Sequence, residues 1–240
     1  MLNKIITGVG LALAVAASPA NAVTNLIKNG SFENGFTGFS HVNAGSLAAP
    51  SVVLEYGQAN SYPVGAYGEA IPADNSISAS PDAVGTHAAY FVDDQAMNEA
   101  VTQLTYLSVG NYEIGFSAYL PGNGFANQGE AAFSATIIGT PVTSFLVSTG
   151  TKQNWVNFNG VAQITLAGHY LTSFNFNTFG GTSKDVVIDR VYAVATDRPA
   201  TVLIPPTPAY VPEPATWGLM LTGFVLTGFA MRRRKIVFTA

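Results

Sequence analysis

Short stretches in which apolar and polar residues alternate recur along the middle of the chain. In residues 111–119 every second residue from Tyr112 to Ala118 is apolar, and in residues 169–179 two phenylalanines alternate with two asparagines. Successive side chains of a β-strand point to opposite faces, so a period of two predicts strands with one buried face. Residues 185–195 carry the same kind of pattern, with apolar side chains at Val186 and Ile188 and then at Val191, Ala193 and Ala195.

Other apolar segments have the length of a strand and are separated by glycine and asparagine clusters typical of turns. These segments are residues 51–56, 88–92, 100–107, 131–138 and 142–147, together with the apolar residues between Phe158 and Leu166 that follow Trp155. Between the two chain ends, no window shows a long helical pattern with a cap. Nine or ten short strands without crossover helices predict an all-β domain in which antiparallel sheets pack as a sandwich.

The first 22 residues have the layout of a secretory signal peptide. Lys4 provides the positive charge, residues 5–17 are apolar, and Ala20 and Ala22 form a small-x-small cleavage site. This order predicts export, with cleavage after Ala22. A buried N-terminal helix is the alternative.

The C-terminal end has three parts in a fixed order. Val211, Pro212, Glu213 and Pro214 come first, an uncharged apolar run follows at 217–231, and four cations end the series: Arg232, Arg233, Arg234 and Lys235. The run is shorter than the roughly 20 residues that a spanning helix needs, so a single transmembrane helix over about residues 215–231 would be marginal. The cations would hold its end on the cytoplasmic side, with a short tail at 236–240.

Residues 211–235 resemble the PEP-CTERM sorting signal of Gram-negative bacteria in motif, apolar run and basic cluster. The resemblance implies recognition by an exosortase that cuts near Pro212–Pro214. It also implies an inner-membrane precursor and a final place at the cell surface or in an extracellular, exopolysaccharide-rich matrix such as a biofilm. An ordinary C-terminal tail anchor is the alternative.

Composition agrees with export. The 240 residues contain no cysteine, 24 glycines and only 10% charged residues, which excludes disulfides and thiol chemistry. Residues 23–212 hold five Lys and Arg against thirteen Asp and Glu, a net charge of −8, and this acidity argues against nucleic acid as a partner. Prolines dominate after Arg198, so we expect one domain at 23–198 and an extended linker at 199–210.

The domain resembles galactose-binding-like jelly-roll modules, a group that includes many carbohydrate-binding modules. The similarity lies in an opening "NLIKNGSFE" strand at 25–33, paired strands around "GNYEIGFSA", a "WVNF" strand from Trp155, and a closing "VIDRV" strand. The group often has a second Asp after the first in the closing strand, where this chain has Arg190.

The resemblance also implies a structural calcium ion between the first and last strands, at Glu33 and Asp189. Carboxylate oxygens suit calcium, which takes six to eight oxygen ligands. The alternative is that both residues are hydrogen-bonded carboxylates without an ion. No other cofactor is expected.

Binding of a polysaccharide would use aromatic faces and planar polar groups. The candidate faces are Tyr90, Tyr119 and Trp155, followed by Phe125 and Tyr170, with Asn123, Asn127 and Gln128 as polar partners. For Trp155 a packing role in its strand is the alternative.

Most sequence signatures of catalysis are absent. There is no GxSxG, HExxH or P-loop, His41, His87 and His169 are isolated, and the adjacent Asp93 and Asp94 would point to opposite faces of a strand. We therefore expect a non-catalytic surface or matrix protein that associates with exopolysaccharide. The alternatives are a secreted glycoside-active hydrolase on the same sandwich and a structural matrix protein without glycan specificity.

Overall fold

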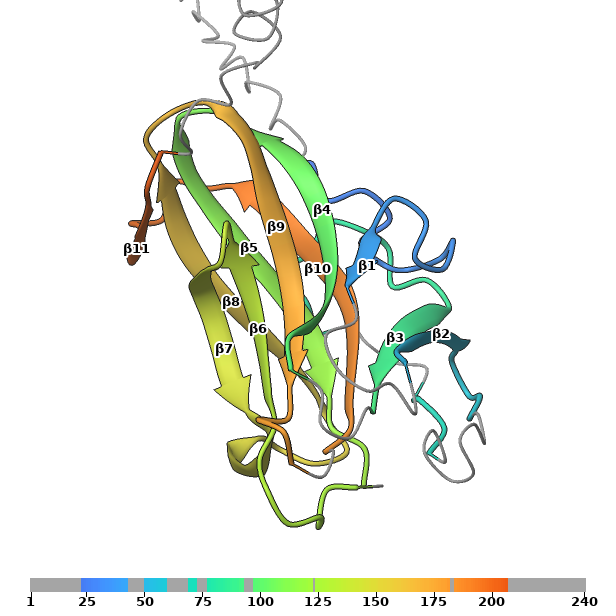
Figure 1. Ribbon diagram of the computed structural model, residues 1–240. Coiled ribbons are helices and arrows are strands. Elements are labelled where there is room, and N and C mark those ends of the chain that lie inside the picture. The colour runs from blue at the N-terminus through green and yellow to red at the C-terminus, as the bar shows by residue number, and fades with distance from the viewer. Residues whose placement is uncertain are drawn as a thin grey trace, which may run out of the picture.

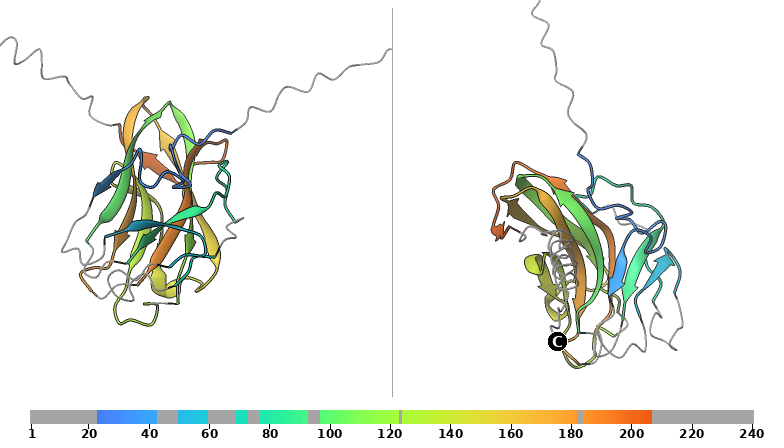
Figure 2. Two further views of the ribbon diagram at one scale, coloured as in Figure 1. Left: turned by 90° about the vertical axis from the view of Figure 1, so that its right-hand side faces the viewer. Right: turned by 45° about the horizontal axis from the view of Figure 1, so that its top comes forward.

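Two facing β-sheets make up the domain in a computed structural model (Figure 1), and two further views show the same sandwich (Figure 2). The structure describes residues 23–42, 50–59, 69–72, 77–92, 97–122, 124–181 and 184–206. The predicted signal peptide with Ala20 and Ala22, the motif at 211–214, the hydrophobic helix and the basic cluster lie outside these residues. Within the described ranges, no helix is long and apolar enough to cross a bilayer.

The first sheet has the strand order β1-β4-β9-β6-β7. Its strands are β1 (Ser40–Val42), β4 (Glu99–Leu107), β9 (Gly168–Asn177), β6 (Ala132–Ile137) and β7 (Thr140–Leu146). The second sheet has the order β11-β8-β5-β10-β3-β2. Its strands are β11 (Val202–Ile204), β8 (Trp155–Ile164), β5 (Gly110–Tyr119), β10 (Val186–Ala195), β3 (His87–Phe91) and β2 (Val52–Glu55). A 3₁₀ turn, Val147–Thr149, follows β7.

The way in which the eight strands from β3 through β10 pair with one another defines a jelly roll. The first of these strands pairs antiparallel with the last, the second with the last but one, and so on inward: β3 with β10, β4 with β9, β5 with β8 and β6 with β7. The four pairs form one long folded ribbon. Rolling the ribbon brings β5 beside β10 and β6 beside β9, which gives the two sheets of a jelly roll. The all-β antiparallel sandwich expected from the sequence is confirmed.

A core rich in phenylalanine fills the space between the sheets. Phe116 of β5 contacts the rings of Phe133, Phe158 and Phe174 with centroids 4.9, 5.7 and 6.3 Å apart. The alternating positions predicted on β5 and β9 point into this core, and Asn175 and Asn177 lie on the other face of β9. Among the described residues, the buried members of both hydrophobic clusters lie between Ile27 and Ile204.

Two segments differ from the sequence prediction. Residues 25–33 form turns instead of an opening strand, because Asn29 and Phe32 adopt positive φ angles of 58° and 55°. The segment still lies against the closing strand, where Leu26 N donates to Ala193 O and Val191 N donates to Gly30 O, both at 2.9 Å. In Figure 1 it runs in blue on the same side of the sandwich as β1, β2 and β3, opposite β7 and β11.

The domain also continues past the predicted boundary at residue 198. Within the predicted linker, β11 pairs in parallel with β8, and Ile204 is fully buried in the core. Prolines before and after β11 do not prevent this pairing, because β11 is an edge strand that offers only one of its edges to the sheet.

Candidate functional site

The outer face of the first sheet carries almost no charge. β6, β7 and β9 contain no charged residue, and the only one in β4 is the buried Glu99. The strand register aligns four hydroxyl side chains in a row across this face: Ser40, Thr102, Ser173 and Thr136. Thr102, Ser173 and Thr136 of this row are only 7%, 6% and 7% exposed, and the Thr102 hydroxyl donates to Ser40 O at 3.3 Å.

A hollow of about 740 Å³ opens where this face meets the N-terminal segment. Its wall on the sheet is formed by Thr102, Leu104 and Tyr106 of β4 and by His169 and Leu171 of β9, and its rim by Leu26, Lys28, Gly38 and Ser40. Beyond Thr102, no strand among the described residues pairs with this edge of β4, so the hollow reaches the bare edge of the sheet.

Tyr106 provides the exposed aromatic ring of this hollow. The residue is 54% exposed and lies directly opposite His169 on β9, with the ring centroids 5.3 Å apart at an angle of 67°. Next to this pair, Leu104 and Leu171 face each other and are 64% and 44% exposed. The arrangement combines an aromatic ring, an apolar strip and hydroxyl groups on one rigid sheet.

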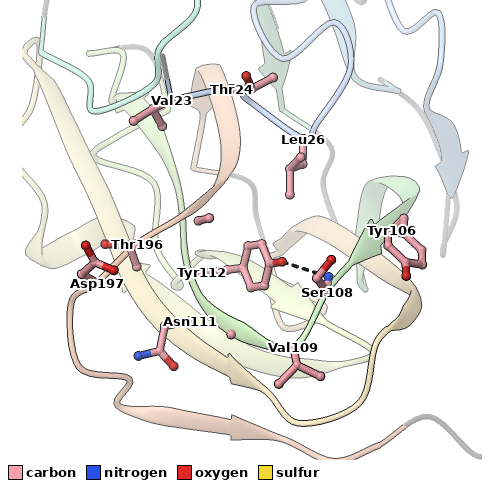
Figure 3. A pocket seen from close by; sticks show the side chains of 12 residues that line it. Val23, Thr24, Leu26, Tyr106, Ser108, Val109, Asn111, Tyr112, Thr196 and Asp197 are labelled. Carbon is pink, nitrogen blue, oxygen red and sulfur yellow. Dashed lines mark hydrogen bonds between the residues drawn. The ribbon is translucent and has the colours of Figure 1, made fainter. Parts of the chain in front are cut away.

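A second cavity, of about 1100 Å³, adjoins the hollow at the end of the sandwich (Figure 3) and shares Leu26 and Tyr106 with it. The start of the described chain, the β4–β5 turn and the end of β10 enclose it. Tyr112 crosses its floor, and its hydroxyl oxygen accepts a hydrogen bond from Ser108 N at 2.9 Å. Asp197 is the only carboxylate among the described residues that line it.

The three aromatic residues predicted to bind ligand lie together on the outer face of the second sheet, but they are covered. Tyr90, Tyr119 and Trp155 are 0%, 6% and 6% exposed, in a cluster with Ile71 and Tyr56. Trp155 Nε1 donates to Pro72 O at 3.3 Å, which fixes the covering segment in place. Their burial supports the packing role that the sequence left open for Trp155.

Carboxylates complete this buried cluster. The Tyr119 hydroxyl donates to Glu69 at 2.7 Å and the Tyr90 hydroxyl donates to Asp185 at 2.9 Å. Burial and these carboxylates raise the pKa of both phenols well above the usual value. The rings therefore stay neutral, as hydrogen-bonded parts of the interior.

The other candidates for sugar contact have structural roles as well. Tyr170 is buried and donates to Leu166 O at 2.6 Å. The Phe125 ring has Lys152 Nζ at 5.8 Å and Lys184 Nζ at 5.6 Å, and Asn127 O accepts from Lys184 at 2.8 Å. Asn123 lies outside the described residues.

Glu33 accepts hydrogen bonds at the start of β3. Its Oε1 accepts from Thr86 N at 2.8 Å and from His87 N at 2.9 Å, and its Oε2 from the Thr86 hydroxyl at 3.0 Å. Desolvation raises the pKa of Glu33, but the bonds to Thr86 and His87 outweigh it, so the net pKa is lowered.

Asp189 is fully buried in β10 and accepts from the Tyr56 hydroxyl and from Arg190 N. Calcium would need the same oxygens of Glu33 and Asp189 that these N–H and O–H donors occupy. No group of three or more acidic or histidine side chains suited to a metal occurs in the described ranges. As arranged here, the pair does not fit a calcium site.

One polar cluster joins residues that the sequence analysis treated separately. His41 Nε2 lies 2.7 Å from Ser51 Oγ and 3.2 Å from Oε1 of the buried Glu99. A catalytic triad needs the serine and the acid on opposite ring nitrogens, whereas here both meet the same nitrogen. The cluster therefore ties β1, β4 and the start of β2 together. Of the other histidines, His87 contacts Glu33 and His169 contacts Tyr106, whereas Asp93 and Asp94 lie outside the described residues.

Residues 211–235 match the family description "PEP-CTERM protein-sorting motif". This stretch is a PEP-CTERM sorting motif. The motif marks the chain as an exported protein of the exosortase system with a cell-surface fate, and it occupies about a tenth of the sequence. No curated protein matches the chain in sequence.

Several solved structures are similar to the sandwich. The carbohydrate-binding module TmCBM61, solved with β-1,4-galactotriose, shares 17% identity at a TM-score of 0.42, covering 72% of this chain and 99% of its own. A cyclase from Fischerella sp. TAU shares 13% at 0.47, covering 74% and 98%. The enzymatically active domain of tailspike protein 4 from bacteriophage CBA120 shares 11% at 0.47, and 72% of this chain matches only 21% of it. The jelly-roll assignment rests on the strand pairing described above.

Proposed function

We propose that the protein is a non-catalytic component of the cell surface or extracellular matrix that binds a polysaccharide on the outer face of its first sheet. An exosortase would process it near Pro212–Pro214, after export through the inner membrane of a Gram-negative bacterium. The observation that carries the binding proposal is the exposed Tyr106 ring in the hollow beside His169.

The chemistry of this face suits a sugar chain. A pyranose offers C–H faces to an aromatic ring and hydroxyl groups to planar polar side chains. Tyr106, Leu104 and Leu171 provide the apolar contacts. Ser40, Thr102 and His169, which line the same hollow, provide polar groups beside these contacts.

The described residues that line these two cavities include no pair of acids. Hydrolysis of a glycosidic bond uses two carboxyl groups that flank the scissile bond. In the part of the chain that the structure describes, no carboxylate lines the hollow and Asp197 alone lines the adjoining cavity. We therefore assign binding, and not hydrolysis, to these two cavities.

The test is binding of residues 23–206 to a panel of neutral and acidic polysaccharides, including the host's own exopolysaccharide, by affinity electrophoresis and calorimetry. Tyr106→Ala should weaken binding by about tenfold or more, because truncating a central aromatic contact typically costs more than 1 kcal/mol. Phe179→Ala is the matched control, since Phe179 is 60% exposed near the opposite end of β9.

Loss of affinity in the Tyr106 variant alone would support this face as the binding site. Equal losses in both variants, or none in either, would refute the site. Failure of the folded domain to bind any member of the panel would favour a structural matrix protein without glycan specificity.

A further inference from the structure

Arg190 is a buried cation at an irregular point of the closing strand. The pairing of β10 with β5 shifts between Asp189 and Tyr192, which marks a β-bulge, and Arg190 has a φ of 50° there. Its side chain is only 8% exposed, and Nη2 donates to Ser80 O at 2.8 Å and to Asp82 O at 2.7 Å.

A guanidinium is seldom buried to this extent without a specific reason. Burying a charge costs several kcal/mol unless hydrogen bonds and an opposite charge compensate for it. A non-glycine residue at positive φ adds strain at the same position. The two hydrogen bonds from the guanidinium to backbone carbonyl groups offset part of these costs.

Backbone carbonyls and a carboxylate are also the ligands that a hard cation such as calcium takes. We propose that the Arg190 guanidinium is a built-in cation that takes the place of calcium, so that the domain folds and keeps its stability without the ion. The inference is independent of the proposed binding of polysaccharide.

The position of Arg190 explains what this internal cation does. Asp82, whose carbonyl it binds, also accepts from Asn25 Nδ2 at 2.6 Å through its carboxylate. Asn25 in turn donates to Val191 O and accepts from Ala193 N, both at 3.0 Å. Arg190 thus fastens the 77–92 segment and the N-terminal segment to β10 at one point.

Lys184 shows the same device at the start of β10. Its side chain is 5% exposed, and Nζ donates to Phe125 O at 2.7 Å and to Asn127 O at 2.8 Å. Each of the two cations is next in sequence to a buried aspartate: Lys184 precedes Asp185, and Arg190 follows Asp189. In both places a side-chain ammonium or guanidinium holds loop carbonyls against the closing strand.

The experiment measures thermal unfolding of residues 23–206 with millimolar calcium and with chelator, and calcium binding by calorimetry. For the unsubstituted domain we expect midpoints that agree within about 1 °C and no heat of binding. Arg190→Met keeps the length of the side chain but removes its charge. It should lower the midpoint by roughly 5–10 °C in both solutions, because two buried carbonyls lose their donor.

Arg190→Asp reverses the charge at the same point. The new carboxylate would lie by the carbonyls of Ser80 and Asp82, which lose their donor, so calcium should raise the midpoint of this variant by several degrees while leaving that of the unsubstituted domain unchanged. The proposal is overturned if calcium stabilises the unsubstituted domain, if Arg190→Met is as stable as that domain, or if calcium has no effect on folded Arg190→Asp.

Discussion

Whether an aromatic side chain on an outer face of the sandwich is exposed depends on whether another segment covers it. Tyr106 and Trp155 both lie on outer faces of the sandwich, on β4 and β8. Tyr106 stays 54% exposed, whereas Trp155 is 6% exposed because residues around Ile71 and Pro72 cover it. Alternation along a strand predicts the face of a side chain. It does not predict whether a distant segment covers that face.

Glu33 allows a test by pH at the residue scale. Its pKa is lowered in the folded protein, so its contribution to stability is present above the unfolded pKa near 4.5 and is lost as the pH falls through the lower folded value. Glu33→Gln should therefore reduce the free energy of unfolding at neutral pH, and the difference from the unsubstituted domain should shrink below about pH 4.

Urea titrations at neutral pH and at about pH 3 measure this difference. Glu55→Gln is the control, since Glu55 is an exposed carboxylate at the end of β2. A Glu33→Gln effect that stays constant across the pH range would show that the charge of Glu33 does not support the start of β3.

At the scale of elements, the closing strand shows how a local irregularity arises. The apolar positions of β10 change from Val186 and Ile188 to Val191 and Ala193, and the bulge at Asp189 and Arg190 accounts for this shift. An extra residue in one strand moves all later side chains to the opposite parity. The change of parity is visible in the sequence pattern, and the structure shows that a β-bulge causes it.

The last strand gives a sharp test of the domain boundary. Ile204 is fully buried and the neighbouring Leu203 is 61% exposed, although both belong to β11. Ile204→Ala should cost about 2 kcal/mol or more of unfolding free energy, because a buried branched side chain is truncated next to β8. Leu203→Ala should cost less than about 0.5 kcal/mol.

Chemical denaturation of residues 23–206 carrying each change measures both values. Equal costs, or a negligible cost for Ile204→Ala, would mean that β11 does not contribute to the core and that the domain ends near residue 198.

At the scale of the whole molecule, the described core and the sorting motif occupy different stretches of the sequence. Both core clusters lie between Ile27 and Ile204, whereas the PEP-CTERM motif begins at residue 211. The uncharged outer face of the first sheet and the acidic remainder of the domain belong to the part that is displayed. Substitutions in the sorting motif should therefore impair sorting without affecting polysaccharide binding, and substitutions on the outer face of the first sheet should do the reverse.

Replacement of Pro212, Glu213 and Pro214 by alanine in the native host tests this separation. The precursor should accumulate in the membrane fraction and its release should fall strongly, because the extended motif in front of the apolar run is lost. Immunoblots of membrane and extracellular fractions measure this. As a control, Tyr106→Ala should leave sorting unchanged, and normal release of the triple-alanine chain would contradict processing at this motif.

The sequence by itself determined the strand positions, the all-β class and the sorting motif, because these depend on local periodicity and on contiguous residues. Nine strands follow the alternating or apolar segments closely, and the motif at 211–235 is contiguous. Only the tertiary structure decided which aromatic residues are exposed, that residues 25–33 form turns, and that β11 closes the second sheet. It also brought Arg190 onto the carbonyls of Ser80 and Asp82. Contacts between residues about 110 positions apart depend on how the ribbon of strands rolls, and no local pattern records them.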